Sequence, residues 1–325
     1  MPRSLQDSYV VVVGGAAIDI TGFPRGQFRL GESTPGEIRT AFGGVGRNIA
    51  ENLARLRIPV KMLTALGDDS YGHGLRHESE KIGIDLSHAL MPKRSGTATY
   101  LAILDEEGDM KAAIASMDIF ERITPDYVRQ HDRLLRGAAA IVVDANLSPP
   151  TLTMLAEQYG NCRLFVDTVS SSKAAKLKPV LGAFHTIKPN RQEAEFLSGQ
   201  SIHTAEDLLA VKNWFIAQGV KQVFISLGAE GVFYGDMKAY AHSRPAPLKI
   251  VNSTGAGDAF MAGLVYGYLH NFGLTPTALW AEAMAALTAR SFTTVHPGMS
   301  VTLVREMLLS NTNLDEERNF TDAHA

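Results

Sequence analysis

Short apolar segments that alternate with helical patterns are the feature that most restricts how this chain can fold. The following apolar segments predict β-strands: Tyr9–Val13, Val60–Ala65, Ala139–Val143, Arg163–Val166, His185–Ile187 and Val223–Ser226. The segments between them with helical spacing are Arg47–Arg57, Leu75–Ile82, Pro125–Arg136, Pro149–Gln158, Gln192–Ser198 and Ala205–Gln218. Nearly continuous apolar strands in such an alternation predict an α/β fold with a mainly parallel sheet that helices cover on both faces.

Two stretches depart from this alternation. Residues 21–40 are rich in Gly, Pro and polar residues, and the extended patterns Thr97–Leu104 and Met110–Ser116 flank a turn at Asp105–Gly108, as in a β-hairpin. We expect these stretches, about 20–40 and 95–118, to form a small β-sheet lid that projects from the main body. Residues 1–310 then form a single domain, and residues 311–325 form a frayed tail.

The composition excludes several classes of partner. The chain has 31 Lys and Arg against 34 Asp and Glu, so its formal charge of −3 gives no general attraction to nucleic acid or to an anionic membrane. No stretch of about 18 apolar residues predicts a membrane span. A single cysteine, Cys162, excludes an internal disulfide and fits a reducing compartment. We therefore expect a cytoplasmic protein.

A glycine-rich turn near the end of the chain has the composition of an anion site. In the motif from Asn252 to Asp258, the small residues Gly255, Ala256 and Gly257 precede a helical pattern. Free N–H groups at the start of a helix favour an anion such as a phosphoryl group. Asp258 at the same place could accept a proton from a hydroxyl, as a general base does in phosphoryl transfer. The alternative is that Asp258 only caps the helix.

A second small-residue turn lies near the start of the chain. Phe42-Gly-Gly-Val-Gly-Arg-Asn48 precedes the helical pattern of Arg47–Arg57, so Asn48 would point towards the same ligand. The motif is not a dinucleotide-binding fingerprint, because Ile49 occupies the third glycine position. Taken alone, it could also be a tight connection from a strand to a helix.

Together, the two turns resemble the paired signatures of the ribokinase-like (PfkB) family of carbohydrate and nucleoside kinases. The resemblance extends from Val10 to about Ser300 and includes the segments Gly14–Asp19, Lys188–Glu193 and Ser226–Gly231. It implies a ribokinase-like three-layer fold with a small β-sheet lid. It also implies phosphoryl transfer from ATP, with Mg²⁺, to an alcohol group of a small sugar or nucleoside.

The resemblance implies a role for each matching residue. Asp258 matches the catalytic base, and Gly255, Ala256 and Gly257 match the anion hole. The positions that hydrogen-bond sugar hydroxyls are Asp19, Gly44 and Asn48. The positions around the nucleotide are Asn190, Glu193, Ser226, Gly228 and Gly231, of which Glu193 would hold Mg²⁺ through water. Asn252 stands where the family usually has Asp beside a monovalent-cation site, so K⁺ activation is an open expectation.

The segments Gly43–Leu53, Val166–Lys173 and Thr186–Glu195 are most similar to the pseudouridine kinases within that family. This similarity implies that the acceptor is the ribose 5′-hydroxyl of pseudouridine. Thr97, Thr99 and Asp118 would then contact the uracil or the ribose, and Lys173 would reach a phosphate unless it is a solvated lysine.

Three alternatives stay open: the same chemistry on ribose or another nucleoside, the same chemistry on a sugar acid, or a catalytically silent sugar- or nucleoside-binding regulator. The resemblance also implies a homodimer that forms through the lid.

Overall fold

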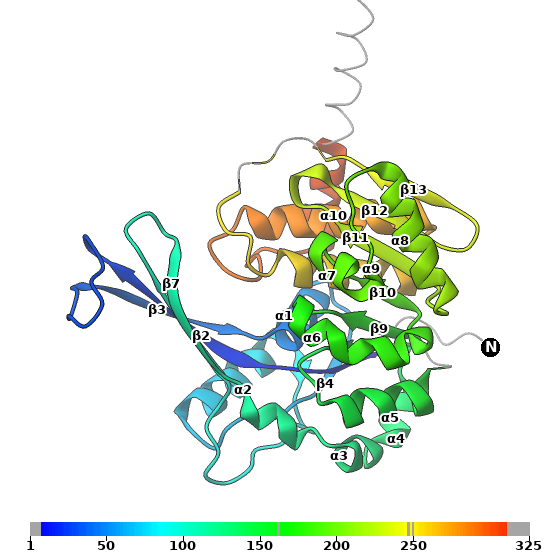
Figure 1. The fold of residues 1–325 in the computed structure, drawn as a ribbon. Helices are drawn as coiled ribbons and strands as arrows, with labels where there is room; N and C mark the ends of the chain where they lie inside the picture. The colour runs from blue at the N-terminus through cyan, green and yellow to red at the C-terminus, as the bar shows by residue number, and fades with distance from the viewer. Residues whose placement is uncertain (1–7, 161–162, 246–247, 249, 311–325) are drawn as a thin grey trace, which may run out of the picture.

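The fold consists of two β-sheets, one central and one projecting to the side (Figure 1). The computed structural model describes residues 8–160, 163–245, 248 and 250–310. Cys162 and the expected tail 311–325 lie outside the described residues. Among the described residues, no helix combines the length and the apolar character needed to span a membrane.

The central sheet has nine strands in the order β13-β12-β11-β10-β9-β8-β1-β4-β5. All neighbours are parallel except β11–β12 and β12–β13, which are antiparallel. The strands are β1 (Val10–Val13), β4 (Val60–Leu63), β5 (Ile84–Asp85), β8 (Ala140–Asp144), β9 (Leu164–Asp167), β10 (Thr186–Lys188), β11 (Gln222–Ser226), β12 (Val232–Gly235) and β13 (Tyr240–Ser243). The expected mainly parallel sheet is confirmed, and the antiparallel edge β12–β13 is an addition.

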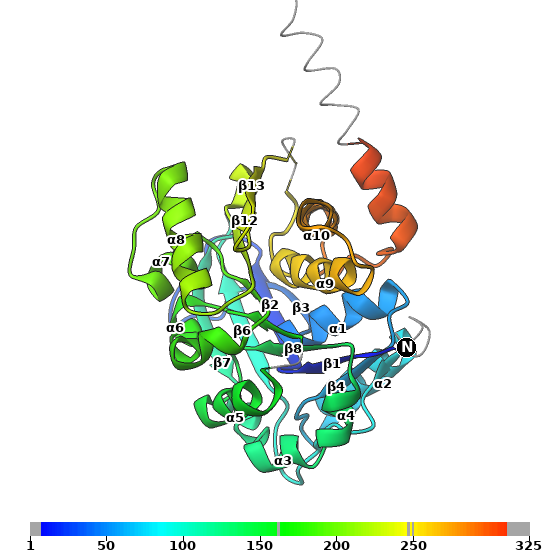
Figure 2. The ribbon, with the colours of Figure 1, turned by 90° about the vertical axis from the view of Figure 1, so that its right-hand side faces the viewer.

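Helices cover both faces of this sheet, which confirms the expected three layers (Figure 2). One face carries α1 (Val45–Arg55), α2 (Ser70–Ile82), α9 (Ala256–Leu269), α10 (Leu274–Ala289) and a helix over residues 301–310. The other carries α3 (Pro125–Arg129), α4 (Asp132–Gly137), α5 (Pro149–Tyr159), α6 (Ser171–Ala174), α7 (Arg191–Ser198), α8 (Ala205–Ala217) and the 3₁₀ helices η2 (Asp118–Arg122) and η3 (Ala175–Ala183).

The valines of β1 show why apolar and polar residues do not alternate along the central strands. Val10 and Val12 pack into the core beneath α1 and α9, whereas Val11 and Val13 pack into the core beneath α5. All four are fully buried, and burial of each stabilises the fold by about 1.5–3 kcal/mol. A strand covered on both faces needs apolar residues at every position.

The projecting sheet has the order β3-β2-β6-β7. Its strands are β2 (Ala17–Pro24), β3 (Gly36–Gly43), β6 (Thr99–Leu104) and β7 (Met110–Ser116). The expected hairpin is the antiparallel pair β6–β7, and β6 joins it to β2 in parallel. The expectation that both departing stretches join in one small sheet is confirmed.

The segment Pro125–Arg136, expected as one helix, forms two short helices instead. The His131 Nδ1 atom lies 2.9 Å from the Tyr127 carbonyl oxygen, which in a continuous helix would accept the His131 N–H. That N–H donates to Val128 instead. The His131 ring also packs edge-on against His88 and Tyr127. Helical spacing alone did not reveal this side-chain competitor for the backbone.

Candidate active site

Three charged residues lie in register at the carboxyl edge of the central sheet. Asp144, Asp167 and Lys188 end β8, β9 and β10, and the register pairs Asp144 with Asp167 and Asp167 with Lys188. All three side chains are buried. Open α/β sheets bind ligands at this edge of their strands. The charges therefore mark where a polar ligand would be bound.

The glycine turn before α9 faces this edge. Gly255 is the N-cap residue of α9 and has φ +84°, a left-handed conformation that favours glycine. A Cβ atom on Gly255 would lie 1.9 Å from the Thr294 carbonyl oxygen, so no larger residue fits there. The first turn of α9 therefore presents its free N–H groups without a side chain in front of them.

Asp258 is in the first turn of α9 but does not cap it. The N-cap residue is Gly255, which has no side chain to cap the helix, and the Asp258 Oδ2 atom accepts a hydrogen bond of 2.8 Å from Asn48 Nδ2. The alternative that Asp258 serves only as a helix cap is therefore wrong. The bond joins residues 210 positions apart in the sequence and brings the two small-residue turns together.

Asn48 reaches Asp258 because α1 also begins at a glycine turn. Gly44 is the N-cap residue of α1 with φ +92°, and Asn48 lies one turn into the helix. Asn48 is 4% exposed, and its Oδ1 atom is buried without a hydrogen-bond partner among the described residues. A buried carbonyl oxygen without a donor is destabilising until a ligand supplies one. A hydroxyl group of an acceptor would supply that donor.

The electrostatics of the site raise the pKa of Asp258. Burial is the main cause, and the nearby Asp167 carboxylate adds to it. The hydrogen bond from Asn48 and the charge of Lys188 act in the opposite direction. A carboxyl group with a raised pKa is a stronger base, which suits an acceptor of a hydroxyl proton.

Asp19, expected to bind a sugar hydroxyl, lies on β2 where the small sheet joins the core. Its carboxylate packs against Gly43, since a Cβ atom there would lie 2.1 Å from Asp19 Oδ2. Burial raises the pKa of Asp19 to about 6, and the charge of Arg47 moderates the rise. Asp19 is thus a carboxylate at neutral pH and can accept hydrogen bonds from hydroxyl groups.

Lys188 is a site residue that the sequence analysis named only within a motif. Its Nζ atom lies 3.2 Å from Asp167 Oδ2, and a Cβ atom on Gly257 would be 3.0 Å from it. Burial acts to lower the pKa of Lys188, but Asp167, Glu193 and Asp258 outweigh burial and raise it. The ammonium group therefore stays charged beside the glycine turn.

Asn190 and Glu193, expected near magnesium and phosphates, form the capping box of α7. The Asn190 Oδ1 atom accepts the Glu193 N–H at 2.8 Å, and Glu193 Oε2 accepts the Asn190 N–H at 2.9 Å. Glu193 Oε2 also accepts a bond of 2.6 Å from the Thr168 hydroxyl. Part of this motif therefore serves the local fold, and Glu193 is held in one orientation.

The other expected nucleotide residues lie along the same edge. Ser226 ends β11 and forms an isolated bridge with Asn190, and Gly228 and Gly231 follow it in a turn with positive φ. Lys173 donates a hydrogen bond of 2.6 Å from Nζ to Asn146 Oδ1, so it is not a freely solvated lysine.

The lid residues Thr97, Thr99 and Asp118 lie in different surroundings from the expected catalytic base Asp258. The Thr97 hydroxyl donates to Asp69 Oδ1 at 2.5 Å and accepts the Gly67 N–H at 3.1 Å. The Thr99 hydroxyl donates to the Thr97 carbonyl at 3.0 Å. Asp118 is exposed at the start of η2. No hydrogen bond links these three side chains to Asp258, Asn48 or Asp19 within the described part of the chain.

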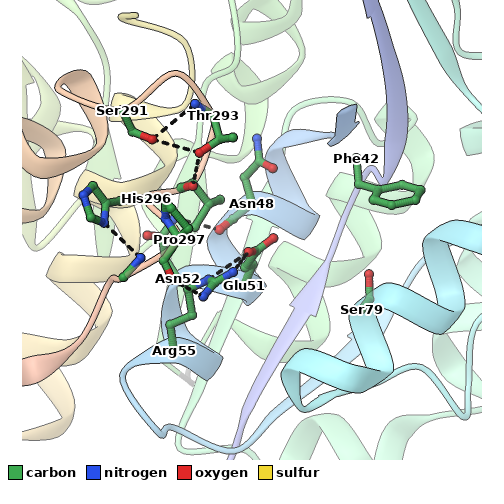
Figure 3. A network of polar contacts seen from close by, with 12 residues as sticks. Phe42, Asn48, Glu51, Asn52, Arg55, Ser79, Ser291, Thr293, His296 and Pro297 are labelled. Atoms are coloured by element: carbon green, nitrogen blue, oxygen red, sulfur yellow. Dashed lines mark hydrogen bonds and ion pairs between the residues drawn. The ribbon is translucent and has the colours of Figure 1, made fainter. Parts of the chain in front are cut away.

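A buried ion network on α1 supports the site (Figure 3). Glu51 pairs with Arg47 at 2.9 Å and with Arg55 at 2.7 Å, and Arg55 Nη1 donates to the Pro297 carbonyl at 2.5 Å. Figure 3 shows Glu51 and Arg55 facing the loop of residues 291–298, which includes Thr293 and His296. The same loop contributes the Thr294 carbonyl that packs on Gly255. The network therefore connects the helix of Asn48 to the support of the glycine turn.

Arg47 extends this network to the base of the small sheet. Its guanidinium group donates to the Phe42 carbonyl at 3.2 Å and to the Ser79 hydroxyl at 3.0 Å. Phe42 lies on β3 and Ser79 on α2. Asp144 ties the opposite side together, because its Oδ2 accepts the N–H groups of Gly15 and Gly46.

The oxygen atoms at the site fit hydrated magnesium better than a metal held by protein alone. In residues 8–160, 163–245, 248 and 250–310, no group of three or more His, Cys, Asp or Glu side chains could hold a metal ion. The carboxylates of Asp167 and Glu193 are both buried, and both act on the charge of Lys188. Mg²⁺ commonly binds one or two carboxylates and completes its shell with water and substrate phosphates.

Known kinases are similar to this chain over most of its length. Over 297 residues the chain is 36% identical to the pseudouridine kinase of Escherichia coli K12, covering 91% of this chain and 95% of the relative. It is equally 36% identical, over 296 residues, to the uncharacterized sugar kinase YeiI of the same organism, covering 91% of this chain and 82% of the relative. These two relatives are both kinases, but they do not agree on one substrate.

Solved structures share the fold. A putative sugar kinase from Clostridium perfringens superimposes with a TM-score of 0.85 at 36% identity, covering 94% of this chain and 96% of that chain. A putative ribokinase II from E. coli in complex with ATP and Mg²⁺ has the same fold, with a TM-score of 0.79 at 17% identity, covering 93% of this chain and 99% of that chain. The fold is therefore ribokinase-like. Residues 7–300 match the model of the pfkB family carbohydrate kinases, and the chain belongs to that family.

Proposed function

We propose that the protein phosphorylates the ribose 5′-hydroxyl of pseudouridine with ATP to give pseudouridine 5′-phosphate. The observation that carries the proposal is the hydrogen bond of 2.8 Å from Asn48 to Asp258 at the glycine turn of α9. It unites a proton acceptor, a polar group for the acceptor molecule and free helix N–H groups in one place. The choice of pseudouridine rests on the similarity to the E. coli enzyme.

The transfer step uses these residues directly. The 5′-hydroxyl oxygen attacks the γ-phosphorus while its proton passes to the Asp258 carboxylate. The bond from the γ-phosphorus to the β–γ bridging oxygen breaks, and its electron pair leaves with ADP. The N–H groups at Gly255, Ala256 and Gly257 stabilise the charge on the transferred group. Asp19, Gly44 and Asn48 orient the sugar through its hydroxyls.

The nucleotide would lie along the carboxyl edge of the sheet. The residues expected around the nucleotide adjoin one another there: Asn190, Ser226, Gly228 and Gly231. Lys173 shares that edge because it donates a hydrogen bond to Asn146, which follows the end of β8. Glu193, together with the buried Asp167 carboxylate, would hold the water shell of Mg²⁺, which neutralises phosphate charge when it is bound. A K⁺ site beside Asn252 stays a prediction, and replacing KCl by NaCl in the assay tests it.

The small sheet would act as a lid over the sugar and exclude water, a competing phosphoryl acceptor.

The small sheet would also form the contact between two copies of the chain in a dimer. Ile38 on β3 and Ile114 on β7 are 75% and 66% exposed, and the apolar side chains around Phe23 and Leu101 line a hollow of about 280 Å³. Exposed apolar sheet surface of this kind favours pairing with a second copy. Light scattering of Ile38→Lys against the wild type tests this, with a monomeric variant as the expected result.

Turnover of an acceptor panel tests the proposed substrate. The panel contains pseudouridine, uridine, ribose, guanosine, fructose and 2-keto-3-deoxygluconate, each measured as ADP formation with Mg-ATP. Pseudouridine is expected to have the highest kcat/KM, and ³¹P NMR should show a phosphate coupled to the two 5′ protons. A free sugar that exceeds pseudouridine in kcat/KM would make the substrate assignment wrong while leaving the kinase chemistry in place. The panel also tests the alternative of a catalytically silent regulator, which would turn over none of the acceptors.

We place the kinase activity in the cytoplasm.

A further inference from the structure

Lys188 is a buried cation among carboxylates at the centre of the site. The residue is 6% exposed, and Asp167, Glu193 and Asp258 all act on its charge. Its Nζ atom forms an ion pair with Asp167 Oδ2 at 3.2 Å, which occupies at most one of the three N–H donors of an ammonium group. The ammonium group thus retains donors for another oxygen.

The position of Lys188 relative to the glycine turn shows where those donors can act. A Cβ atom on Gly257 would lie 3.0 Å from Lys188 Nζ. The N–H groups of the first turn of α9 and the ammonium group therefore border the same space. Two kinds of positive group around one space favour an anion between them.

Other cations near the site have partners of their own. Lys173 donates to Asn146, and Arg47 is enclosed by Glu51, Ser79 and Phe42. Lys188 is therefore the buried cation beside Gly257 whose donors remain available within the described residues.

We propose that Lys188 is a catalytic residue: its ammonium group binds the γ-phosphoryl group during transfer and stabilises the negative charge of the transition state. This role rests on the proposed kinase function. As the acceptor oxygen bonds to phosphorus and the bridging oxygen leaves with its electron pair, the oxygens of the transferred group stay anionic, and Lys188 neutralises part of that charge without giving up its proton.

The test compares Lys188→Met with Lys212→Met. Both lysines are buried, at 6% and 5% exposure, but Lys212 lies on α8 and donates to the Asp236 carbonyl. We expect Lys188→Met to lower kcat about 100- to 1,000-fold, the effect of removing one transition-state donor, with KM for the acceptor changed less than about threefold. Lys212→Met should keep kcat within about threefold of the wild type.

Two further readouts separate catalysis from structural support. The affinity for the non-hydrolysable triphosphate AMP-PNP, measured by calorimetry, should fall about tenfold or more in Lys188→Met, whereas the affinity for AMP stays unchanged. The acidic limb of the kcat profile should move to higher pH, because Lys188 lowers the pKa of Asp258. Lys188→Arg, which keeps the charge, should recover part of the AMP-PNP affinity and serves if the Met variant does not fold.

The outcomes distinguish this proposal from the proposed function. A folded Lys188→Met with wild-type kcat and wild-type AMP-PNP affinity overturns the role of Lys188, whatever the acceptor is. A wild-type protein that turns over no acceptor in the panel contradicts the proposed function. In that case the AMP-PNP and AMP affinities still decide whether Lys188 binds the terminal phosphate.

Discussion

Gly255→Ala tests whether the close contact under the anion turn sets the geometry of catalysis. Gly255 has φ +84°, so an alanine there carries a left-handed strain of about 1–2 kcal/mol. Its methyl group would lie 1.9 Å from the Thr294 carbonyl oxygen, which is more than 1 Å short of an ordinary contact. Relief of that overlap requires the turn and the 291–298 loop to separate, at a further cost of about 1–3 kcal/mol.

Gly199→Ala is the matched control, because Gly199 has φ +71° at the end of α7 and an added methyl would meet no atom within 4 Å. It carries the backbone strain without the overlap, so we expect it to lose about 1–2 kcal/mol in the free energy of unfolding and to keep kcat. Gly255→Ala should lose about 2–5 kcal/mol by urea unfolding, the sum of the strain and the overlap. Its kcat should fall about 100-fold, since a displacement of about 1 Å in an active site has an effect of that size.

Steady-state kinetics with saturating Mg-ATP and urea unfolding followed by circular dichroism provide the two measurements. If Gly255→Ala matches Gly199→Ala in both kcat and stability, the contact with Thr294 does not set the geometry of the turn. That result would mean that the loop of Thr294 moves aside freely and does not define the anion turn.

Three further predictions concern the charges of the site. Asp258→Asn should lower kcat about 10²- to 10⁴-fold with little change in acceptor affinity by calorimetry; an unchanged kcat would exclude Asp258 as the base. Because burial raises the pKa of Asp19 to about 6, protonation of Asp19 below that pH should lower the acceptor kcat/KM by about tenfold per pH unit beyond the decrease that protonation of Asp258 already causes. Arg47→Met should move this limb to higher pH, since Arg47 lowers the pKa of Asp19, and an unmoved limb would contradict that coupling. Glu51→Gln leaves the buried Arg47 without its counter-charge and should lower the free energy of unfolding by about 3–5 kcal/mol in urea titrations, whereas a loss below about 1 kcal/mol would show that the network is not needed for stability.

The sequence predicts the central sheet and both glycine turns because their signals are local. Val10–Val13 are apolar at each position, and Gly44 and Gly255 stand where a helix begins after a left-handed residue. Glycine adopts such a conformation without steric cost, so a run of small residues before a helical pattern indicates a turn of this kind. The two turns also predicted that Asn48 points towards the ligand at the turn of Asp258, and the resemblance then gave both residues their roles.

The parts that the sequence did not reveal depend on distant partners. Lys188 ends a three-residue strand, and only the register with Asp167 and the position of Gly257 make it a site residue. Nothing in the sequence around Thr97 indicates that its hydroxyl donates a hydrogen bond to Asp69. The helix expected over Pro125–Arg136 is interrupted at His131, because its ring nitrogen competes with the backbone N–H for the Tyr127 carbonyl oxygen. A pattern of apolar residues does not predict this competition.

The bond between Asn48 and Asp258 has a consequence for how the protein is made. Its two partners are 210 positions apart, and Gly255 further needs the Thr294 carbonyl. A ribosome adds about 5–20 residues per second, so Asn48 is made at least about ten seconds before Asp258. The emerging polypeptide can fold β1, α1 and β4 in that interval, yet it has no complete site until residues beyond 294 have left the exit tunnel. A nascent chain therefore lacks the packing partner of the glycine turn until the loop of residues 291–298 has emerged from the ribosome.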